Sequence, residues 1–324
     1  MTKFSSPEAI AAPERSIFET EIIAGLSKPQ KSIPCQYFYD AAGSALFEKI
    51  TVLQEYYPTR TEIAILHACV AEIAARTPMG SVLVEFGSGS STKTDILLAA
   101  CPAITRYVPI DVSPTALSEA KTRLKSQFPL LSVEPILGDF AAGVALPGDI
   151  QGLPKLGFFP GSTIGNFTDD QAIALLSRFR ALLGQSSRLI VGADLRKSAN
   201  VLVAAYDDSD GVTAAFNLNL LARINRELAG TFNLSKFQHL ATYDIEAGRI
   251  DMFLVSMADQ TITVAGTPFQ FVKGEKIHTE ISQKYTVDAM QDLGRRAGWQ
   301  VAAVWTDPAQ LFSVHEFTVP NEAP

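Results

Sequence analysis

The feature that most constrains the fold is a regular alternation of short apolar runs with amphipathic helical segments. The clearest case is Val82-Leu83-Val84, which leads into Glu85-Phe86-Gly87-Ser88-Gly89 and then into a helical stretch, a pattern typical of a strand, a glycine turn and a helix. Further strands are predicted at 106–111, 133–137, 156–159 and 188–191, and helices at 60–76, 114–128 and 168–184. Strands and helices alternating at this spacing predict βαβ units and an α/β fold with a parallel, doubly wound sheet.

The predicted helices carry residues that favour helix ends at fixed positions. Thr59 is the predicted N-cap of the first helix, and Ser113 that of a later one. The spacing of Thr168 and Gln171 fits a capping box, and Gly184 is placed to end that helix. These residues set the expected ends of the predicted helices.

The pattern changes near residue 237. Polar and apolar residues alternate up to residue 285 between glycine-containing turns, which predicts an antiparallel meander. A helix over 287–297, closed by Gly298, and two strands within 299–319 then return to the first pattern. The β-rich stretch is therefore predicted to be inserted into the α/β domain.

Composition limits the class of protein. The 324 residues (35.0 kDa) are 47% apolar and 19% charged, which is typical of a globular chain. The formal net charge is −7, without a long Lys/Arg run, so no nucleic-acid partner is expected. No apolar stretch approaches the ~20 residues of a membrane-spanning helix, and residues 1–15 lack the apolar centre of a signal peptide. No membrane association is expected.

Cysteine and histidine usage predicts neither a disulfide framework nor a metal site. Cys35, Cys69 and Cys101 lie far apart without a CxxC spacing, so a reducing, cytoplasmic setting is predicted. The four histidines are dispersed, and no histidine-built metal site is expected. The acidic run 207–211 does not fit a calcium loop, because Tyr206 occupies the first ligand position. The chain is expected to act as a monomer.

Polar and aromatic residues follow three consecutive predicted strands. Glu85 and Gly87 end the first, Asp111 ends the second, and Asp139 and Phe140 end the third. A carboxylate at such a strand end can accept both hydroxyls of a ribose, and an aromatic ring offers a face for adenine. A nucleoside cofactor lying across these strand ends is the economical interpretation.

Two cofactors fit such a site. A dinucleotide site usually has a third glycine where this chain has Thr92, and no second phosphate contact is evident in the sequence. S-adenosylmethionine carries no phosphates but has an amino-acid tail, which an acidic strand end before the glycines suits. S-adenosylmethionine is therefore favoured, and a nicotinamide-dependent oxidoreductase stays open as the alternative.

A further polar segment, 161–166, follows the fourth predicted strand. In a doubly wound fold it lies over the cofactor crevice, so its polar groups would face a substrate. An alternative is that Ser162 and Thr163 cap the loop while Asn166 takes a left-handed turn. The sequence leaves both interpretations open.

A second polar face is predicted in the segment Ile277–Ser282. A period of two places His278, Glu280 and Ser282 on one face of a strand, so that Glu280 and Ser282 lie side by side. Taken alone, this pattern fits a solvated outer face better than a binding site.

Several long strings, distributed over essentially the whole chain, are far more specific than a glycine turn. They resemble the histidine Nα-methyltransferases of ergothioneine biosynthesis, the EgtD family. The strings are Tyr37-Phe38-Tyr39-Asp40, Glu55-Tyr56-Tyr57-Pro58-Thr59-Arg60-Thr61-Glu62, Glu85-Phe86-Gly87-Ser88-Gly89, Gly161-Ser162-Thr163-Ile164-Gly165-Asn166, Tyr206-Asp207-Asp208, Gly211-Val212-Thr213-Ala214-Ala215-Phe216-Asn217, Asn225-Arg226-Glu227-Leu228 and Thr279-Glu280-x-Ser282.

The resemblance implies a fold and a division of the chain. The expected fold is a class I S-adenosylmethionine-dependent methyltransferase, with a Rossmann-like doubly wound sheet, joined to a second, α+β substrate-binding domain. The methyltransferase core is expected over 61–195 and 286–324, and the substrate-binding domain over 1–60 and 196–285.

The resemblance also implies roles for residues at matching positions. Those expected to hold the cofactor are Gly87, Lys93, Asp111, Asp139 and Phe140. Those expected to bind the substrate are Asn166 and Tyr206 at its carboxylate, Gly161 and Thr163 near its amine, Glu280 and Ser282 at its imidazole, and Met252 and Phe47 along that pocket. Tyr39, near the amine, and Tyr56, bridging cofactor and substrate, are the expected catalytic residues. One departure is Ser90-Ser91-Thr92, where the family carries an acidic side chain.

The activity implied is trimethylation of the α-amino group of L-histidine, giving hercynine. Methyl transfer from a sulfonium to an amine is an in-line displacement, so alignment of an unprotonated amine in a dry site can supply most of the catalysis. The sequence shows no strong general base for the proton that the amine loses. Water or a tyrosine hydroxyl would accept this proton. Alternatives are methylation of another aromatic amino acid and a noncatalytic amino-acid-binding module.

Overall fold

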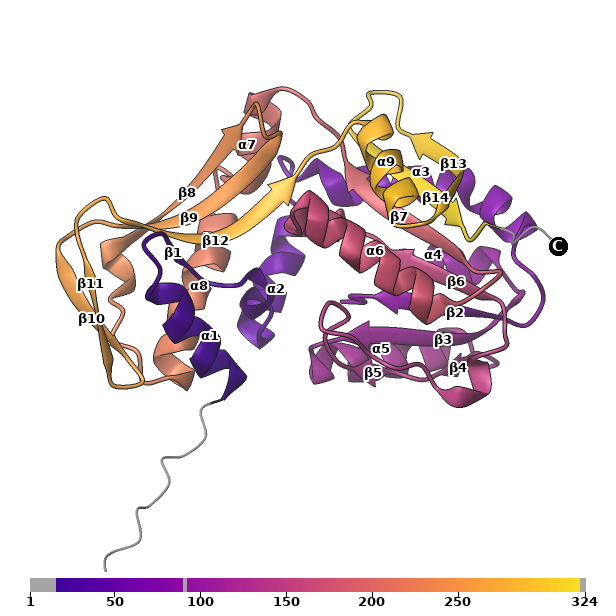
Figure 1. The fold of residues 1–324 in the computed structure, drawn as a ribbon, viewed down its shortest axis with the longest axis horizontal. Coiled ribbons are helices and arrows are strands. Elements are labelled where there is room, and N and C mark those ends of the chain that lie inside the picture. Colours follow the sequence, from indigo (N-terminus) through magenta and orange to yellow (C-terminus); the bar gives the residue numbers. More distant parts are fainter. Residues whose placement is uncertain (1–15, 90–91, 321–324) are drawn as a thin grey trace, which may run out of the picture.

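The computed structural model describes residues 16–89 and 92–320. Two lobes are visible, each built around its own β-sheet (Figure 1). In the described part of the chain, eight strands form the larger sheet, with the order β13-β14-β7-β6-β2-β3-β4, and β5 also pairs with β3. Their bounds are β2 Ser81–Phe86, β3 Ile104–Asp111, β4 Ser132–Val133, β5 Ile136–Leu137, β6 Lys155–Phe159, β7 Arg188–Asp194, β13 Gln300–Thr306 and β14 Phe312–Thr318.

The larger sheet is parallel from β4 to β7 and ends in an antiparallel hairpin. β2 pairs in parallel with β3 on one side and with β6 on the other. The strand order therefore reverses direction at β2 and β6, which is the switch point where open α/β sheets bind ligands. β14 runs antiparallel to both β7 and β13. The doubly wound parallel sheet predicted from the alternation is confirmed.

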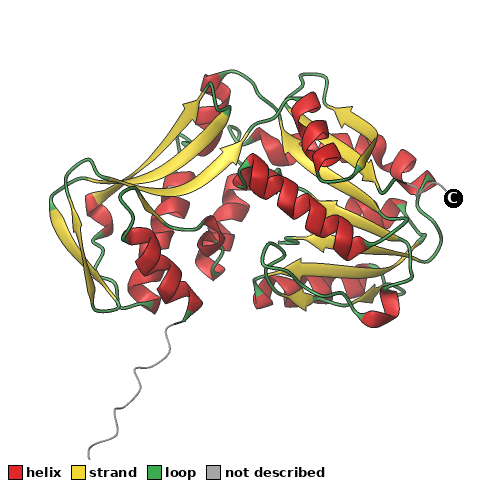
Figure 2. Ribbon diagram, viewed as in Figure 1, coloured by secondary structure: helices red, strands yellow, loops and turns green. Residues whose placement is uncertain are grey.

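Helices cover both faces of this sheet (Figure 2). One face buries side chains of α3 (Tyr57–Ala75), α4 (Thr92–Ala100) and α5 (Pro114–Gln127), and the other buries side chains of α6 (Asp169–Leu183) and α9 (Val287–Arg296). Alternate residues of β2 enter opposite cores, since Leu83 belongs to the first cluster and Val84 to the second. Burial of both faces explains why the strands are continuously apolar rather than alternating.

Most predicted helix ends are confirmed and one is wrong. The Ser113 hydroxyl accepts a hydrogen bond from the Ala116 amide, and α6 has the predicted capping box and ends at Gly184. However, α3 begins at Tyr57 rather than after Thr59. Pro58 in the first turn explains the difference, because its fixed φ suits that position and its missing N–H costs nothing there.

The predicted third strand is interrupted. Residues 133–137 form two short pieces, β4 and β5, which both pair with β3. Pro135 lies between them. Because proline has no backbone N–H to donate to the neighbouring strand, it breaks the hydrogen-bond ladder at this point.

The second lobe contains a four-stranded sheet with the order β1-β12-β9-β8. Its strands are β1 Lys31–Ser32, β8 Phe237–Asp244, β9 Arg249–Ser256 and β12 Lys276–Gln283. The predicted antiparallel pairing is confirmed for β8, β9 and β12. The prediction of one continuous meander is wrong, because β10 (Gln260–Val264) and β11 (Thr267–Phe271) pair with each other as a separate ribbon.

The N-terminal segment packs into this second lobe. β1 adds to β12 in parallel, and Figure 1 shows the indigo elements α1 (Ile17–Leu26) and β1 beside the orange strands. One hydrophobic cluster joins Ile22 and Phe38 to Leu221 and Met252. The lobe is completed by α2 (Ala41–Thr51), α7 (Ala199–Tyr206) and α8 (Val212–Glu227).

Helix α3 runs through the position where the sequence predicts a domain boundary, between residues 60 and 61. Within the described residues, no helix combines the length and the apolar character needed to cross a membrane.

Candidate active site

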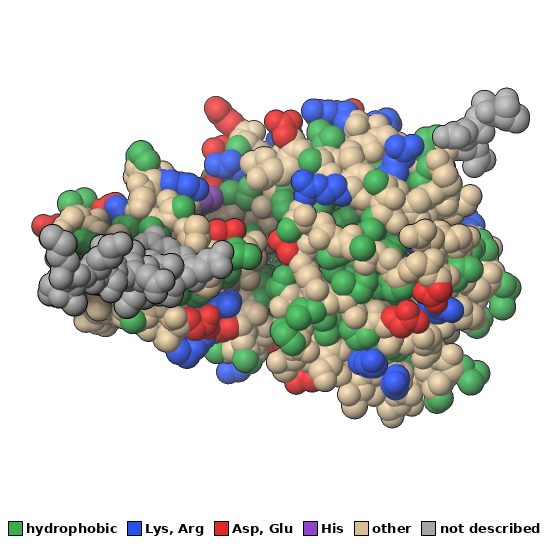
Figure 3. All heavy atoms as spheres, turned by 60° about the horizontal axis from the view of Figure 1, so that its bottom comes forward, with side chains coloured by type: hydrophobic (Ala, Val, Ile, Leu, Met, Phe, Trp, Pro, Cys, Tyr) green, Lys and Arg blue, Asp and Glu red, His purple; other side chains and the backbone are tan. Residues whose placement is uncertain are grey.

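A cavity of about 930 Å³ lies between the lobes, at the carboxyl ends of the parallel strands. Figure 3 shows the molecular surface hollowed where the two lobes meet. Every residue for which the sequence predicts a site role lines this cavity: Tyr39, Phe47, Tyr56, Gly87, Lys93, Asp111, Asp139, Phe140, Gly161, Thr163, Asn166, Tyr206, Met252, Glu280 and Ser282. The fold thus brings together residues from positions 39 to 282 of the chain.

The first part of the cavity lies over the ends of β2, β3 and β5. The Asp111 carboxylate accepts the amides of Gly89 (3.0 Å) and Ser113 (2.9 Å), which fixes it at the end of β3. Gly87 has φ +75°, and a side chain there would approach the Phe140 ring to 3.3 Å. The backbone is therefore free to pass close to a ligand that lies against this ring.

Glu85 is buried beneath the glycine turn. It accepts hydrogen bonds from the hydroxyls of Thr94 on α4 (2.5 Å) and Tyr107 on β3. Burial raises the pKa of Glu85 to about 7, although these two hydrogen bonds favour the charged form and oppose the shift. Glu85 thus ties the turn to both neighbouring elements as well as lining the cavity.

The donor set of this first part fits S-adenosylmethionine. Asp111 offers an acceptor of the kind that ribose hydroxyls need, Phe140 an aromatic face that could hold adenine, and Lys93 a cation that could meet the carboxylate of an amino-acid tail. Of the sequence departure at 90–92, Ser90 and Ser91 lie outside the described residues.

The second part of the cavity lies against β9 and β12, where a β-bulge changes the predicted alternation. His278 pairs with Phe253, but Glu280 pairs with Met252, so Thr279 is the extra residue. The predicted face shared by His278 and Glu280 is therefore wrong. Beyond the bulge, Glu280 and Ser282 do lie on one face as predicted, and that face lines the cavity rather than solvent.

The bulge directs His278 away from the cavity. Its Nε2 lies 2.9 Å from the Asp251 carboxylate, and Asp251 pairs with Ile281, on the face opposite Glu280. No glycine or proline marks the position of the bulge in the sequence. A strict period of two therefore predicts the wrong face for His278.

Glu280 is the main electrostatic feature of this part of the cavity. Burial raises the pKa of its carboxyl to about 7, while the charge of Lys284 acts in the opposite direction. Near neutral pH the group can therefore donate or accept a hydrogen bond. Such a group suits a ring that carries both an N–H and an unprotonated nitrogen.

Replacing Glu280 with glutamine is expected to stabilise the ligand-free protein at pH 8, by about 3 kcal/mol. Its folded-state pKa of about 7 lies above the ordinary value of 4.5, so the carboxyl destabilises the fold increasingly as pH rises from 4.5 to 7. The gain should be present at pH 8 and vanish near pH 4.5. Urea unfolding of both proteins across this range measures it.

The matched control is Glu246→Gln in the exposed turn between β8 and β9, which should change the free energy of unfolding by less than about 0.5 kcal/mol. A Glu280→Gln effect that is independent of pH would contradict the assignment of the raised pKa.

Aromatic side chains form a wall of the cavity on the side of the second lobe. Tyr39 and Phe47 meet edge to face with ring centroids 5.7 Å apart, and Tyr56 lies 6.3 Å from Phe47 and 6.4 Å from Tyr206. Burial raises the pKa values of Tyr39 and Tyr56 well above their usual range. Both are therefore neutral phenols near neutral pH, able to donate and accept hydrogen bonds.

The loop after β6 connects the two parts. Gly161 has φ +81°, and its amide donates to both carboxylate oxygens of Glu62 (3.1 and 2.9 Å). The Thr163 hydroxyl donates to the Pro160 carbonyl (3.0 Å), but the following 3₁₀ turn has no side-chain cap. The left-handed residue of this loop is Ser162 (φ +58°) and not Asn166, so the alternative interpretation of the loop is wrong on this point. Asn166, at the end of the 3₁₀ turn Thr163–Asn166, lines the cavity.

Three buried charged residues of the site are missed by the sequence analysis: Glu62, Asp194 and Lys284. Glu62 also forms an ion pair with Lys93. Lys284 follows Ser282 at the same period of two, so the alternation continued by one step would have indicated it. Asp194 is the last residue of β7. An acidic residue at a strand end is the sequence signal that would have indicated it.

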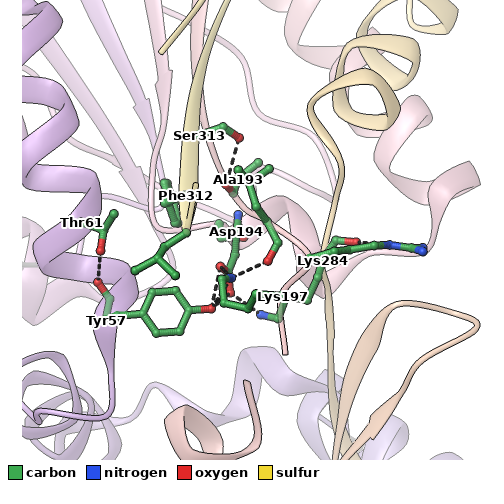
Figure 4. Close-up of polar contacts among 12 residues, drawn as sticks. Tyr57, Thr61, Ala193, Asp194, Lys197, Lys284, Phe312 and Ser313 are labelled. Atoms are coloured by element: carbon green, nitrogen blue, oxygen red, sulfur yellow. Dashed lines mark hydrogen bonds and ion pairs between the residues drawn. The ribbon is translucent and has the colours of Figure 1, made fainter. Parts of the chain in front are cut away.

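Asp194 is the centre of a buried network (Figure 4). Its carboxylate accepts from the Tyr57 hydroxyl (2.7 Å), Lys197 Nζ (2.6 Å) and Lys284 Nζ (2.8 Å). Burial alone would raise the pKa of Asp194, but the charges of Lys284 and Lys197 outweigh burial and hold the pKa below its usual value. This charged carboxylate therefore anchors two lysines, and one of them, Lys284, donates to Tyr206 and Ser282, which line the cavity.

The sheet, the switch-point cavity and its donor set define an S-adenosylmethionine-dependent methyltransferase of class I. The fold is similar to the solved PH0226 protein from Pyrococcus horikoshii, with a TM-score of 0.50 and 14% identity, over 87% of this chain and 100% of that one. At this identity the likeness concerns the fold alone.

Comparison with known sequences gives the family. The chain belongs to the S-adenosylmethionine-dependent, histidine-specific methyltransferases, whose family model matches residues 18–319. It is 40% identical to a histidine N-alpha-methyltransferase of Mycolicibacterium smegmatis, over 91% of this chain and 92% of that protein. It is 28% identical to an ergothioneine biosynthesis protein 1 of Neurospora crassa, over 85% of this chain and 32% of that longer protein. The nicotinamide-dependent alternative is thereby set aside.

Proposed function

We propose that the chain trimethylates the α-amino group of L-histidine to give hercynine, a step of ergothioneine biosynthesis. The observation that carries this proposal is the pair Glu280 and Ser282, side by side on a buried cavity wall of a chain that belongs to the histidine-specific family. A carboxyl and a hydroxyl that lie two residues apart on one face of a strand can hydrogen-bond to both nitrogens of an imidazole. A site built on such hydrogen bonds rejects ligands that leave its buried polar groups unpaired.

S-adenosylmethionine supplies the electrophilic methyl group when bound. We assign its adenine to Phe140, its ribose to Asp111 and its amino-acid tail to Lys93, with Gly87 and Asp139 completing that part of the site. These residues end neighbouring parallel strands or begin the following helix, which supports a shared role.

We assign the substrate carboxylate to Asn166 and Tyr206. The amine is then placed near Gly161, Thr163 and Tyr39, with Tyr56 between the two ligands. The remaining pocket residues are Met252 and Phe47, which lie beside the imidazole. The aromatic wall limits water around the amine, so that positioning and desolvation can lower the barrier to displacement.

Incubating the purified protein with L-histidine and S-adenosylmethionine should yield a product heavier by three steps of about 14 Da, because the site positions the α-amine for repeated transfer. Mass spectrometry of reactions with histidine, phenylalanine, tyrosine and tryptophan measures both the reaction and its breadth. Absence of any mass increase with histidine would overturn the proposal. An equal rate with phenylalanine would contradict the role of Glu280 and Ser282.

We further propose that the chain acts as a monomer in the cytoplasm, with the domain division given above. The three cysteines are free thiols in the structure, which supports a reducing compartment. Size-exclusion chromatography with light scattering tests the monomer.

A further inference from the structure

Lys284 places a buried ammonium behind two neighbouring hydroxyls of the cavity lining, those of Tyr206 and Ser282. Its Nζ lies 2.8 Å from Asp194 Oδ2, 2.8 Å from the Tyr206 hydroxyl and 2.8 Å from Ser282 Oγ. The side chain has no exposed surface. An ammonium has three protons, so each of these oxygens receives one of them.

The two hydroxyls are also bonded to each other. Tyr206 and Ser282 have their oxygens 2.8 Å apart, with either able to donate. Each hydroxyl has one proton to give, and each already accepts from Lys284. One hydroxyl proton therefore lies between the two oxygens, and only the other is free to point into the cavity.

We infer that Lys284 is a positioning residue that makes Tyr206 the donor and Ser282 the acceptor toward the substrate. Either Tyr206 donates to Ser282 or Ser282 donates to Tyr206. The bound ligand selects between these two arrangements. A carboxylate offers only acceptors, and a hydrogen bond donated to a charged oxygen is stronger than one between neutral hydroxyls. The inference rests on the proposed placement of the substrate carboxylate at Tyr206.

The consequence for the ring is specific. With its proton donated to Tyr206, Ser282 can only accept, so it selects a ring nitrogen that carries hydrogen. Glu280 then faces the other nitrogen. The hydrogen bond between Tyr206 and Ser282, which Lys284 holds in place, would thus link recognition of the substrate carboxylate to recognition of its imidazole ring.

The test compares Lys284→Met with Lys197→Met in the full-length protein. Both remove a buried ammonium from the same carboxylate, Asp194, but the hydrogen bonds of Lys197 go to Tyr57, Asp194 and Leu195, and not to Tyr206 or Ser282. Lys284→Met should raise the KM for histidine at least tenfold, with kcat changed less than threefold and the KM for S-adenosylmethionine within twofold. Lys197→Met should lower the melting temperature and leave the KM for histidine within twofold.

A double-mutant cycle separates positioning from general stability. In a Tyr206→Phe background, Lys284→Met should raise the KM for histidine by no more than a further twofold, because the hydroxyl through which it acts is gone. The same tenfold rise in both backgrounds would overturn the inference. So would an equal effect of Lys197→Met.

If Lys284→Met does not fold, Lys284→Gln replaces it under the same criterion. A second cycle leaves Lys284 intact and combines Tyr206→Phe with Ser282→Ala, which should be strongly non-additive if the hydroxyls share one proton; additivity would overturn the inference. Wild-type enzyme that fails to methylate histidine would instead refute the proposed function, so the two failures are distinguishable.

Discussion

Substitution of Glu280 by alanine is expected to lower kcat/KM for histidine about 100-fold, a loss of about 3 kcal/mol in transition-state stabilisation. The carboxyl lies in the cavity wall beside Ser282, and its removal leaves one imidazole nitrogen without a partner in a site shielded from water. The KM for S-adenosylmethionine should stay within about twofold, because Glu280 lies in the part of the cavity formed by β9 and β12. Steady-state kinetics with each substrate varied in turn measures both effects.

Phenylalanine serves as the comparison substrate for this variant. Its ring makes no hydrogen bond to Glu280, so the low rate expected with phenylalanine should not fall further in Glu280→Ala. Glu246→Ala, in the exposed β8–β9 turn, is the control for a general effect of removing a carboxylate. A loss of less than threefold with histidine, or an equal loss of cofactor affinity, would show that Glu280 does not contact the ring.

The fold could be predicted largely because local pattern and global topology agree. Each predicted strand of the larger sheet is present, since burial on both faces requires continuous apolar runs that are visible in the sequence. The errors fall where one residue overrides the pattern. Pro135 divides the third strand, and Pro58 moves the start of α3. The pairing of β1 with β12 joins residues 31 and 277, and no local pattern indicates so distant a partner.

The cofactor part of the site was more predictable than the substrate part for a geometric reason. Asp111 and Phe140 follow neighbouring parallel strands, and such strands end at one edge of a sheet, so sequence position implies proximity. Glu280 and Ser282 lie on the sheet of the other lobe. Their period of two shows that they share a face of the strand, but not whether this face is exposed to solvent or buried. Only the resemblance to a known family indicated their role, and the structure places them in the cavity.

The charged residues that the sequence analysis missed act across long separations. Glu62 contacts Gly161, 99 residues away, and Lys284 contacts Tyr206, 78 residues away. Glu62 falls within one of the strings that carry the family resemblance, yet nothing in its local sequence shows which loop it meets. Buried polar networks of this kind are defined by tertiary packing, because their partners are fixed only when the lobes are assembled.

Substitution of Glu62 by alanine is expected to lower kcat/KM for both S-adenosylmethionine and histidine, each by about 100-fold, since loss of a buried charge partner costs about 3 kcal/mol or more. Glu62 is almost fully buried on α3. Its carboxylate pairs with Lys93, at the proposed cofactor tail, and accepts the amide of Gly161, beside the proposed amine. One carboxylate therefore holds a group from each half of the site.

The glutamine variant separates these two contacts. An amide oxygen can still accept from the Gly161 amide but no longer balances the charge of Lys93, so Glu62→Gln should raise the KM for S-adenosylmethionine about tenfold while the KM for histidine stays within about threefold. Glu72→Gln, on the exposed side of the same helix, controls for changes in α3 itself. If alanine and glutamine affected both substrates equally, Glu62 would support the fold of the loop without linking its two ligands. The graded result would instead show that one buried carboxylate supports both halves of the site, through Lys93 on one side and the Gly161 amide on the other.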